Sequence, residues 1–284
     1  MPATGTCERD ASMAAFFQLL VPAILAALFA QGQWPDLPAH WFPNRTPTMP
    51  DAPLTLCYDE RIPGWEVDVA IANELTDSLL LQVEFINVDR QFRSEMEFDF
   101  LYVDLVDRCT AYLGFKLFSD SYPDWSMLTR PFYESRFVLV TTDADAERLE
   151  DFPPGTRIGV SQGTMGDIQF LTYNNELPTN RQWRRLPLGD PDIALQALLD
   201  GRAEALIIWE PELYDAAKDD EDIRNLRVLD TPLISEPWIG VGAMLTVDRT
   251  FELTLLDEGL KSISEDGTVD RVLEEFGYPA RAAE

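Results

Sequence analysis

The chain contains a single histidine, His40, which lies in a proline-rich stretch without strand or helix periodicity. Histidine is the usual proton carrier of Ser-His-Asp hydrolysis and a common ligand of catalytic zinc, so both chemistries lose that carrier in the rest of the chain. The spacing Asp143-x-Asp145-x-Glu147 offers the carboxylates of a calcium loop, but Arg148 stands where an EF-hand needs glycine. We therefore expect no catalytic residue, no metal site and no cofactor.

Cysteine is the other residue type that could do chemistry. Cys7 lies near the N-terminus, whereas Cys57 and Cys109 lie in two apolar runs. The sequence has no Cys-x-x-Cys spacing, which excludes thioredoxin-like redox and zinc-ribbon motifs. Cys57 and Cys109 are either a disulfide formed in an oxidising compartment or two buried free thiols in neighbouring strands, and the sequence leaves both alternatives open.

The N-terminal region has the pattern of a secretory signal. Residues 13–30 are almost wholly apolar, with Pro22 inside the run and Ala30 before a polar segment. This pattern predicts a signal peptide at residues 1–30, and an uncleaved anchor or a buried helix is the alternative. Residues 31–51 are a proline-rich linker. A signal peptide implies a periplasmic protein.

Acidic residues dominate the composition. The chain has 50 Asp+Glu against 22 Lys+Arg, a formal net charge of −28. Such a surface repels phosphate groups, so we expect neither nucleic acid nor anionic lipid as a partner. We also expect a monomer. Nearly all basic residues are arginine, since the only lysines are Lys116, Lys218 and Lys261.

Beyond residue 52, short apolar runs alternate with helical periodicity, which is typical of an α/β protein. The pattern restarts near residue 155, so we expect two open sheets. The predicted strands are 54–58, 82–88, 109–115, 137–141, 157–160, 204–209, 227–229 and 239–246. The predicted helices are 65–80, 165–173, 192–199, 211–218, 251–263 and 268–276.

Five segments of this α/β region occur in an order that resembles a known family. They are LTLCYDE with GWEVDVAIANEL (64–75), LTRPFYESRFVLVTT (128–142), GTRIGVSQGTMG (155–166), ALQALLDGRAEALIIWEPELY (194–214) and LLDEGLKSISEDGTVDRVLEEFG (255–277). Together they resemble bacterial extracellular solute-binding proteins of family 3. The resemblance implies a two-lobed periplasmic-binding-protein-like fold of type II, with two open mixed sheets joined by hinge strands. It places lobe I at 52–142 plus 238–284 and lobe II at 143–237, with a small molecule in the cleft between them.

The resemblance also guides the choice of site residues. The turn from Ser161 to Thr164 precedes a predicted helix, so its N–H groups could hold a polar or anionic ligand group, with a plain strand-to-helix connection as the alternative. An aromatic, apolar cleft is expected around it. The predicted ligand-binding residues are Tyr58, Asp59, Trp65, Tyr122, Trp125, Ser161, Gly163, Thr164, Trp209 and Glu210, and Trp238 is a further aromatic candidate.

The amino-acid receptors of this family hold the ligand by two charged groups that this chain lacks. The resemblance implies that their carboxylate-binding arginine falls near Tyr122. Their ammonium-binding aspartate falls at Trp209, with Glu210 beside it. We therefore expect a ligand other than a standard α-amino acid, presented to a membrane permease of an ABC transporter.

Two alternatives remain. A narrower resemblance, carried by LTLCYDE, CTAYLGF, the 208–211 turn and the ending EFGYP, is to family 3-like proteins associated with quinoprotein (methanol-type) dehydrogenases. It implies an accessory or activator protein whose partner is the dehydrogenase, and it gives the pair Cys57 and Cys109 a use. The remote alternative is a dehydratase-like enzyme with Glu210 or Asp59 as its acid.

Two charged segments are expected to be loops. Arg181, Arg184 and Arg185 surround Trp183 and are expected on a lobe surface, with contact to an acidic partner or an anionic ligand as the alternative. The charge run 218–222 is expected to be a solvated loop between a helix and a strand.

Overall fold

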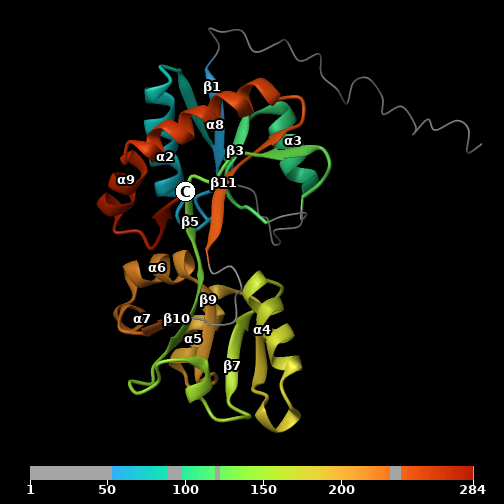
Figure 1. Cartoon of the computed structure of the whole chain (residues 1–284), viewed down its shortest axis with the longest axis vertical. Helices are drawn as coiled ribbons and strands as arrows, with labels where there is room; N and C mark the ends of the chain where they lie inside the picture. The colour runs from blue at the N-terminus through green and yellow to red at the C-terminus, as the bar shows by residue number, and fades with distance from the viewer. Residues whose placement is uncertain (1–52, 89–97, 119–121, 231–237, 284) are drawn as a thin grey trace, which may run out of the picture. The chain divides into compact units, whose positions relative to one another are not determined.

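The computed structural model describes residues 53–88, 98–118, 122–230 and 238–283 (Figure 1). The predicted signal peptide (1–30) and linker (31–51) lie outside the described residues. None of the helices in the described ranges is long and apolar enough to cross a membrane.

The first sheet is built around three parallel strands. β1 (Leu54–Tyr58) pairs with β2 (Val83–Asn87) on one side and with β3 (Ala111–Lys116) on the other. The antiparallel strands that complete it are β11 (Ile239–Thr246) on β3, β4 (Ser126–Leu128) and β5 (Tyr133–Ser135) on β11, and β12 (Arg281–Ala282) on β5. The described residues thus form a seven-stranded mixed sheet.

The second sheet has five strands in the described residues, in the order β10-β6-β9-β7-β8. Its strands are β6 (Phe137–Thr141), β7 (Arg157–Ser161), β8 (Arg184–Leu188), β9 (Ala205–Trp209) and β10 (Arg227–Asp230). Every residue of β6 and β9 is buried, which explains their continuous apolar sequences. The predicted α/β fold with two open mixed sheets is confirmed.

Helices lie against both sheets (Figure 1). Those of the first sheet are α2 (Trp65–Ser78), α3 (Phe98–Asp107), α8 (Thr250–Glu265) and α9 (Thr268–Phe276). Those of the second sheet are α4 (Met165–Glu176), α5 (Pro191–Leu199), α6 (Glu210–Asp219) and α7 (Glu221–Arg224). Two 3₁₀ turns, η2 (Leu149–Asp151) and η3 (Thr179–Arg181), complete the described elements.

Local sequence explains where the helices of the second sheet begin. Thr164 caps α4 by accepting a hydrogen bond from the Asp167 N–H, and Asp190 caps α5 in the same way, with Pro191 in the first turn. Asp220 accepts from the N–H groups of Asp222 and Ile223 and so begins α7. The prediction of a solvated loop at 218–222 is therefore wrong, because Lys218 and Asp219 end α6 and Glu221 and Asp222 begin α7.

The chain crosses between the sheets at Arg136 and returns between Asp230 and Ile239. Tyr133–Ser135 belongs to the first sheet and Phe137–Thr141 to the second. The sequence placed lobe I up to residue 142, whereas β6 pairs with β9 and β10 in the second sheet. The two segments are separated by one residue, Arg136, and no glycine or proline marks the crossover in the sequence.

A further correction concerns the arginines around Trp183. Arg184 and Arg185, predicted to lie in a surface loop, belong to β8 at the edge of the second sheet. Trp183 before it is buried, and its indole N–H donates to the carbonyl oxygen of Phe152 at 2.8 Å. An edge strand tolerates arginine and proline because one side of its backbone remains unpaired, so RRLPL does not carry a clear strand signal.

Candidate functional site

Four of the strands end at residues that could contact a ligand. Tyr58 ends β1, Lys116 ends β3, Ser161 ends β7 and Trp209 ends β9. The first two strands are parallel neighbours in one sheet, and the last two are parallel neighbours in the other. In open α/β sheets, ligands bind outside the carboxyl ends of the strands.

Lys116 connects the carboxyl ends of the two sheets. Its Nζ lies 3.9 Å from a carboxylate oxygen of Glu212, in the first turn of α6, and 5.1 Å from the centroid of the Trp209 ring. The side chains of Lys116 and Glu212 are only 15% and 12% exposed. A cation against an aromatic face and a carboxylate is a favourable arrangement, and here it links β3 to β9 and α6.

Sequence reasoning named Trp209 but missed its two charged neighbours. Trp209 is 3% exposed, and its ring lies 5.1 Å from that of Phe137. A signal for Lys116 was present, because it is one of three lysines in the chain and directly follows an apolar strand. No such signal marks Glu212, which is one of many carboxylates.

Tyr58 and Trp65 form the aromatic part of the site in the first sheet. Their rings stack with centroids 5.3 Å apart and an interplanar angle of 17°. Asp59 between them in sequence is 5% exposed, and Arg61 binds both of its carboxylate oxygens, at 2.8 and 2.5 Å. Asp59 thus has an internal cation as its partner.

The turn after β7 is occupied by the chain's own carboxylate. Gly163 has a φ of +81°, and its N–H donates to Asp167 Oδ2 at 2.9 Å. Arg185 donates to both oxygens of Asp167 at 2.6 Å. Burial opposes ionisation of Asp167, but the hydrogen bonds from Arg185 and Gly163 outweigh it and lower the pKa of the carboxyl group. The Oγ of Ser161 is buried without a hydrogen-bond partner among the described residues.

Tyr122 and Trp125 lie in a different cluster from Trp209. They pack at the edge of a hydrophobic cluster that contains Cys57 and Cys109. The Tyr122 ring meets the edge of Phe115 with centroids 6.3 Å apart, and Trp125 meets Tyr102 at 5.0 Å. The Tyr122 hydroxyl donates to the carbonyl oxygen of Lys116, so it supports β3 where that strand ends.

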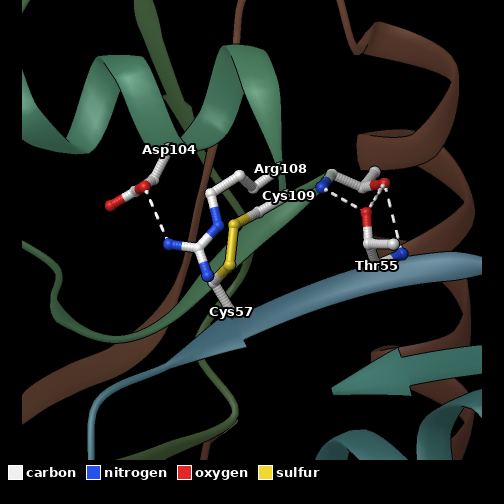
Figure 2. Close-up of a disulfide and its surroundings, with 6 residues drawn as sticks. Thr55, Cys57, Asp104, Arg108 and Cys109 are labelled. Carbon is white, nitrogen blue, oxygen red and sulfur yellow. Dashed lines mark hydrogen bonds and ion pairs between the residues drawn. A yellow bond between two sulfur atoms is a disulfide. The ribbon is translucent and has the colours of Figure 1, made fainter. Parts of the chain in front are cut away.

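Cys57 and Cys109 form a disulfide (Figure 2). It joins β1 to the segment after α3, and next to it Thr55 and Thr110 hydrogen-bond to each other at 3.2 Å. Arg108, on the same segment, pairs with the buried Asp104 at 3.4 Å. Of the two alternatives that the sequence left open, the structure has the disulfide.

Glu210 and Trp238 lie at the crossovers between the sheets. Arg136 Nε donates to the Glu210 carboxylate at 3.0 Å. The guanidinium carbons of Arg136 and Arg281 lie 5.1 and 4.5 Å from the centroid of the Trp238 ring, and Arg281 also binds Glu134. We call Glu134, Arg136, Glu210, Trp238 and Arg281 the crossover cluster.

A buried carboxyl group bonds to Tyr133 of β5, the residue before Glu134 of this cluster. Asp68 of α2 is 1% exposed, and its Oδ1 has no hydrogen-bond partner among the described residues. Burial raises the pKa of Asp68 to about 7, although a hydrogen bond from the Tyr133 hydroxyl opposes the shift. The Tyr133 and Tyr278 hydroxyls are 3.4 Å apart, so a chain of three polar groups extends from α2 to Tyr278, the second residue after α9.

Comparison with known proteins supports a fold assignment. Neither a protein-family model nor the sequence of a curated protein matches the chain. The substrate binding protein of an amino acid ABC transporter is 16% identical, with a TM-score of 0.54 over 79% of this chain and 99% of that one. The GluR0 ligand-binding core in complex with L-glutamate is 10% identical, with a TM-score of 0.58 over 79% and 98%.

A third solved structure is an ancestral amino acid-binding protein described as a precursor of cyclohexadienyl dehydratase. It is 18% identical, with a TM-score of 0.55 over 78% of this chain and 94% of that one. Identities this low define the fold alone. The chain has the two-lobed, periplasmic-binding-protein-like fold of type II, with two mixed sheets and flanking helices.

Proposed function

We propose that the chain is a periplasmic solute-binding protein that closes over a small molecule at the carboxyl ends of β1, β3, β7 and β9. The observation that carries the proposal is the contact of Lys116 with Trp209 and Glu212, because it brings the ends of strands from two sheets to one place. Similar structures described as substrate-binding and ligand-binding proteins support the class.

The residues proposed to contact the ligand are those near these strand ends. Tyr58 and Trp65 offer a stacked aromatic surface, and Trp209 supports the Lys116 ammonium that lies against its ring. The buried Oγ of Ser161 offers a polar group beside Gly163 and Thr164. Apolar surfaces with a few polar groups are typical of small-molecule sites.

The ligand is proposed to be something other than a standard α-amino acid. The position at which the family's receptors bind an ammonium group falls at Trp209, and the ammonium of Lys116 already lies against that ring. Asp59 and Glu210, the two carboxylates predicted to contact the ligand, pair with Arg61 and Arg136.

The proposed compartment rests on the disulfide and on the expected signal peptide. A disulfide between Cys57 and Cys109 is typical of proteins that fold in an oxidising environment such as the periplasm. With the expected signal peptide, this favours a periplasmic receptor whose partner is a membrane permease.

A thermal-shift screen tests the proposal. The full chain is heated with members of several compound classes, namely organic acids, sugars, alcohols, amines and amino acids. A ligand at 100 times its dissociation constant stabilises the folded state by about 2.7 kcal/mol, which is a shift in melting temperature of roughly 5–10 °C for a chain of this size. We expect a shift with a compound that is not an amino acid, and the absence of a shift in every class would contradict the proposal.

A second candidate function is that of an accessory protein for a periplasmic quinoprotein dehydrogenase. It is favoured by internal pairing at the site, since Asp59, Asp167, Glu210 and Glu212 all pair with cationic side chains of this chain. Carboxylates paired with cations of the same chain are expected in a protein that needs no dissociable ligand. Co-purification with the dehydrogenase, or a rise in its turnover when this protein is added, is the test.

The dehydratase-like alternative is not proposed. It needs Glu210 or Asp59 as a proton donor to substrate. Arg61 holds both oxygens of Asp59, and Arg136 holds Glu210 at the crossover. Both carboxyl groups therefore bind an arginine of this chain, and we propose neither of them as a proton donor to a substrate.

A further inference from the structure

Lysine is rare in this chain, and its placement is unusual. Of the three lysines, Lys116 and Lys218 both pair with a glutamate that belongs to the other sheet and its helices. Lys116 of β3 meets Glu212 of α6, and Lys218 of α6 meets Glu66 of α2 at 3.0 Å. Lys261 pairs with Glu265 on the same helix, at 4.0 Å, and is 54% exposed.

Of the two ion pairs between the sheets, the one between Lys116 and Glu212 is the more buried. The exposed fractions are 15% and 12% for Lys116 and Glu212, against 37% for each partner of the pair Lys218 and Glu66. The Lys116 ammonium also faces the ring of Trp209, which is itself 3% exposed. An aromatic face with a carboxylate beside it is the arrangement that recognises ammonium groups in general, and partial removal from water strengthens it.

We propose that Trp209 and Glu212 form an ammonium site that is filled by the chain's own Lys116, which makes Lys116 a specificity-determining residue. The inference deepens the proposed function and rests on it for the native ligand. The molecule bound at the carboxyl ends of the strands then carries no ammonium group at this place.

Electrostatic repulsion explains why the site would exclude a ligand ammonium group. A ligand ammonium placed near Trp209 would lie within a few ångströms of the Lys116 Nζ, where two like charges with little water between them repel each other. A carboxylate or a neutral polar group has no such penalty, because it can accept a hydrogen bond from the Lys116 ammonium. Carboxylic acids and neutral polyols are therefore the ligand classes that the site admits, and amines and zwitterionic amino acids are those that it rejects.

Replacing Lys116 by alanine opens the ammonium site and allows a direct test. The substitution Lys116→Ala removes three carbons and the ammonium, which is the size of propylammonium. We expect propylammonium chloride to raise the melting temperature of Lys116→Ala above the value in the same concentration of sodium chloride. We expect wild type and Lys116→Met to show the same melting temperature in both salts, because their long side chains fill the site.

Two further variants separate this site from a general effect of cations on an acidic protein. Lys261→Ala loses an exposed lysine and should not respond to propylammonium beyond the sodium chloride control. The double variant Lys116→Ala/Glu212→Gln keeps the cavity but loses the carboxylate, so its affinity for propylammonium should fall about tenfold. Propanol, which has the same shape without the charge, should have no effect on Lys116→Ala.

The outcomes distinguish the inference from the function on which it rests. An equal response of Lys116→Ala and Lys261→Ala to propylammonium would overturn the ammonium site while leaving a solute-binding function in place. Wild-type protein that binds an α-amino acid would also overturn it. A specific response of Lys116→Ala, together with no ligand for wild type in the screen, would support the ammonium site and contradict the receptor function.

If Lys116→Ala does not fold, wild type and Glu212→Gln are titrated with amines and organic acids instead. Equal affinity of wild type for both classes would overturn the inference.

Discussion

Arg136 and Glu210 are bonded to each other twice where the chain crosses from the first sheet to the second. The N–H of Glu210 donates to the carbonyl oxygen of Arg136 at 2.9 Å, and Arg136 Nε donates to the Glu210 carboxylate at 3.0 Å. Glu210 follows β9 directly, so the pair ties the end of that strand to the crossover. The sequence predicted Glu210 as a ligand contact, and the structure gives it a partner within the chain.

The first prediction concerns this pair. Glu210→Gln replaces a charge-assisted hydrogen bond by a neutral one and should lower the free energy of unfolding by about 1 kcal/mol, since both side chains are only partly buried. Urea denaturation measures the loss. Arg148→Gln, which breaks the more exposed pair with Asp151, is the control and should leave stability almost unchanged. Unchanged stability with lost ligand binding would return Glu210 to the ligand site.

The second prediction is a pH dependence from Asp68. Its pKa is raised from 3.8 to about 7 in the folded protein, so the folded state holds a proton that the unfolded state loses. The stabilisation is complete below pH 3.8 and is lost as the pH rises toward about 7, with a total of about 4 kcal/mol. Denaturation curves of wild type and Asp68→Asn between pH 4 and pH 8 measure this. The free energy of unfolding of wild type minus that of Asp68→Asn should fall as the pH rises across that range. A constant difference would contradict the prediction.

The strands with buried residues on both faces were predictable from sequence. FVLVT and ALIIW are continuous apolar runs, and the structure places them at 137–141 and 205–209 as fully buried strands. The helix 268–276 was predicted with its observed bounds, because glycine precedes and follows an amphipathic run. Local chemistry was sufficient in these cases.

The missed elements have pairings that their own sequences do not indicate. β4 and β5 are three residues long and exist because β11 offers them an edge. α3 carries a buried aspartate, Asp104, which weakens its apolar pattern. The contact between Lys116 and Glu212 depends on how two sheets meet, and the residue pattern of a single sequence gives no signal for such a pair.

The third prediction concerns the disulfide. Cys57 and Cys109 are 52 residues apart, and a cross-link over such a loop stabilises the folded state by about 4 kcal/mol in the chain-entropy description. The double substitution Cys57→Ala/Cys109→Ala should therefore lower the free energy of unfolding by an amount of this order. Guanidinium denaturation of oxidised wild type and of the double variant measures it. Equal midpoints for the two would show that the cysteines are not bonded.

The fourth prediction concerns Gly64, which precedes α2. It has a φ of +89°, and a Cβ at this position would lie 2.0 Å from the Tyr278 hydroxyl oxygen. Gly64→Ala should lower stability by about 3 kcal/mol, from backbone strain and a clash together. Gly155→Ala is a matched control with a φ of +84° and no atom within 4 Å of the added Cβ, so it should show the strain alone, about 1 kcal/mol. Equal losses in the two variants would remove the clash from the explanation.

A calorimetric titration of the full chain with the best compound from the thermal-shift screen shows whether a ligand binds where β3 and β9 end. We expect one ligand per chain, a negative heat-capacity change from apolar burial, and at least tenfold weaker binding in Trp209→Leu. Trp125→Leu, altered at an aromatic residue in the disulfide cluster, should bind as wild type does. Full affinity in Trp209→Leu, or loss of binding in Trp125→Leu alone, would contradict a ligand site at the carboxyl ends of β3 and β9.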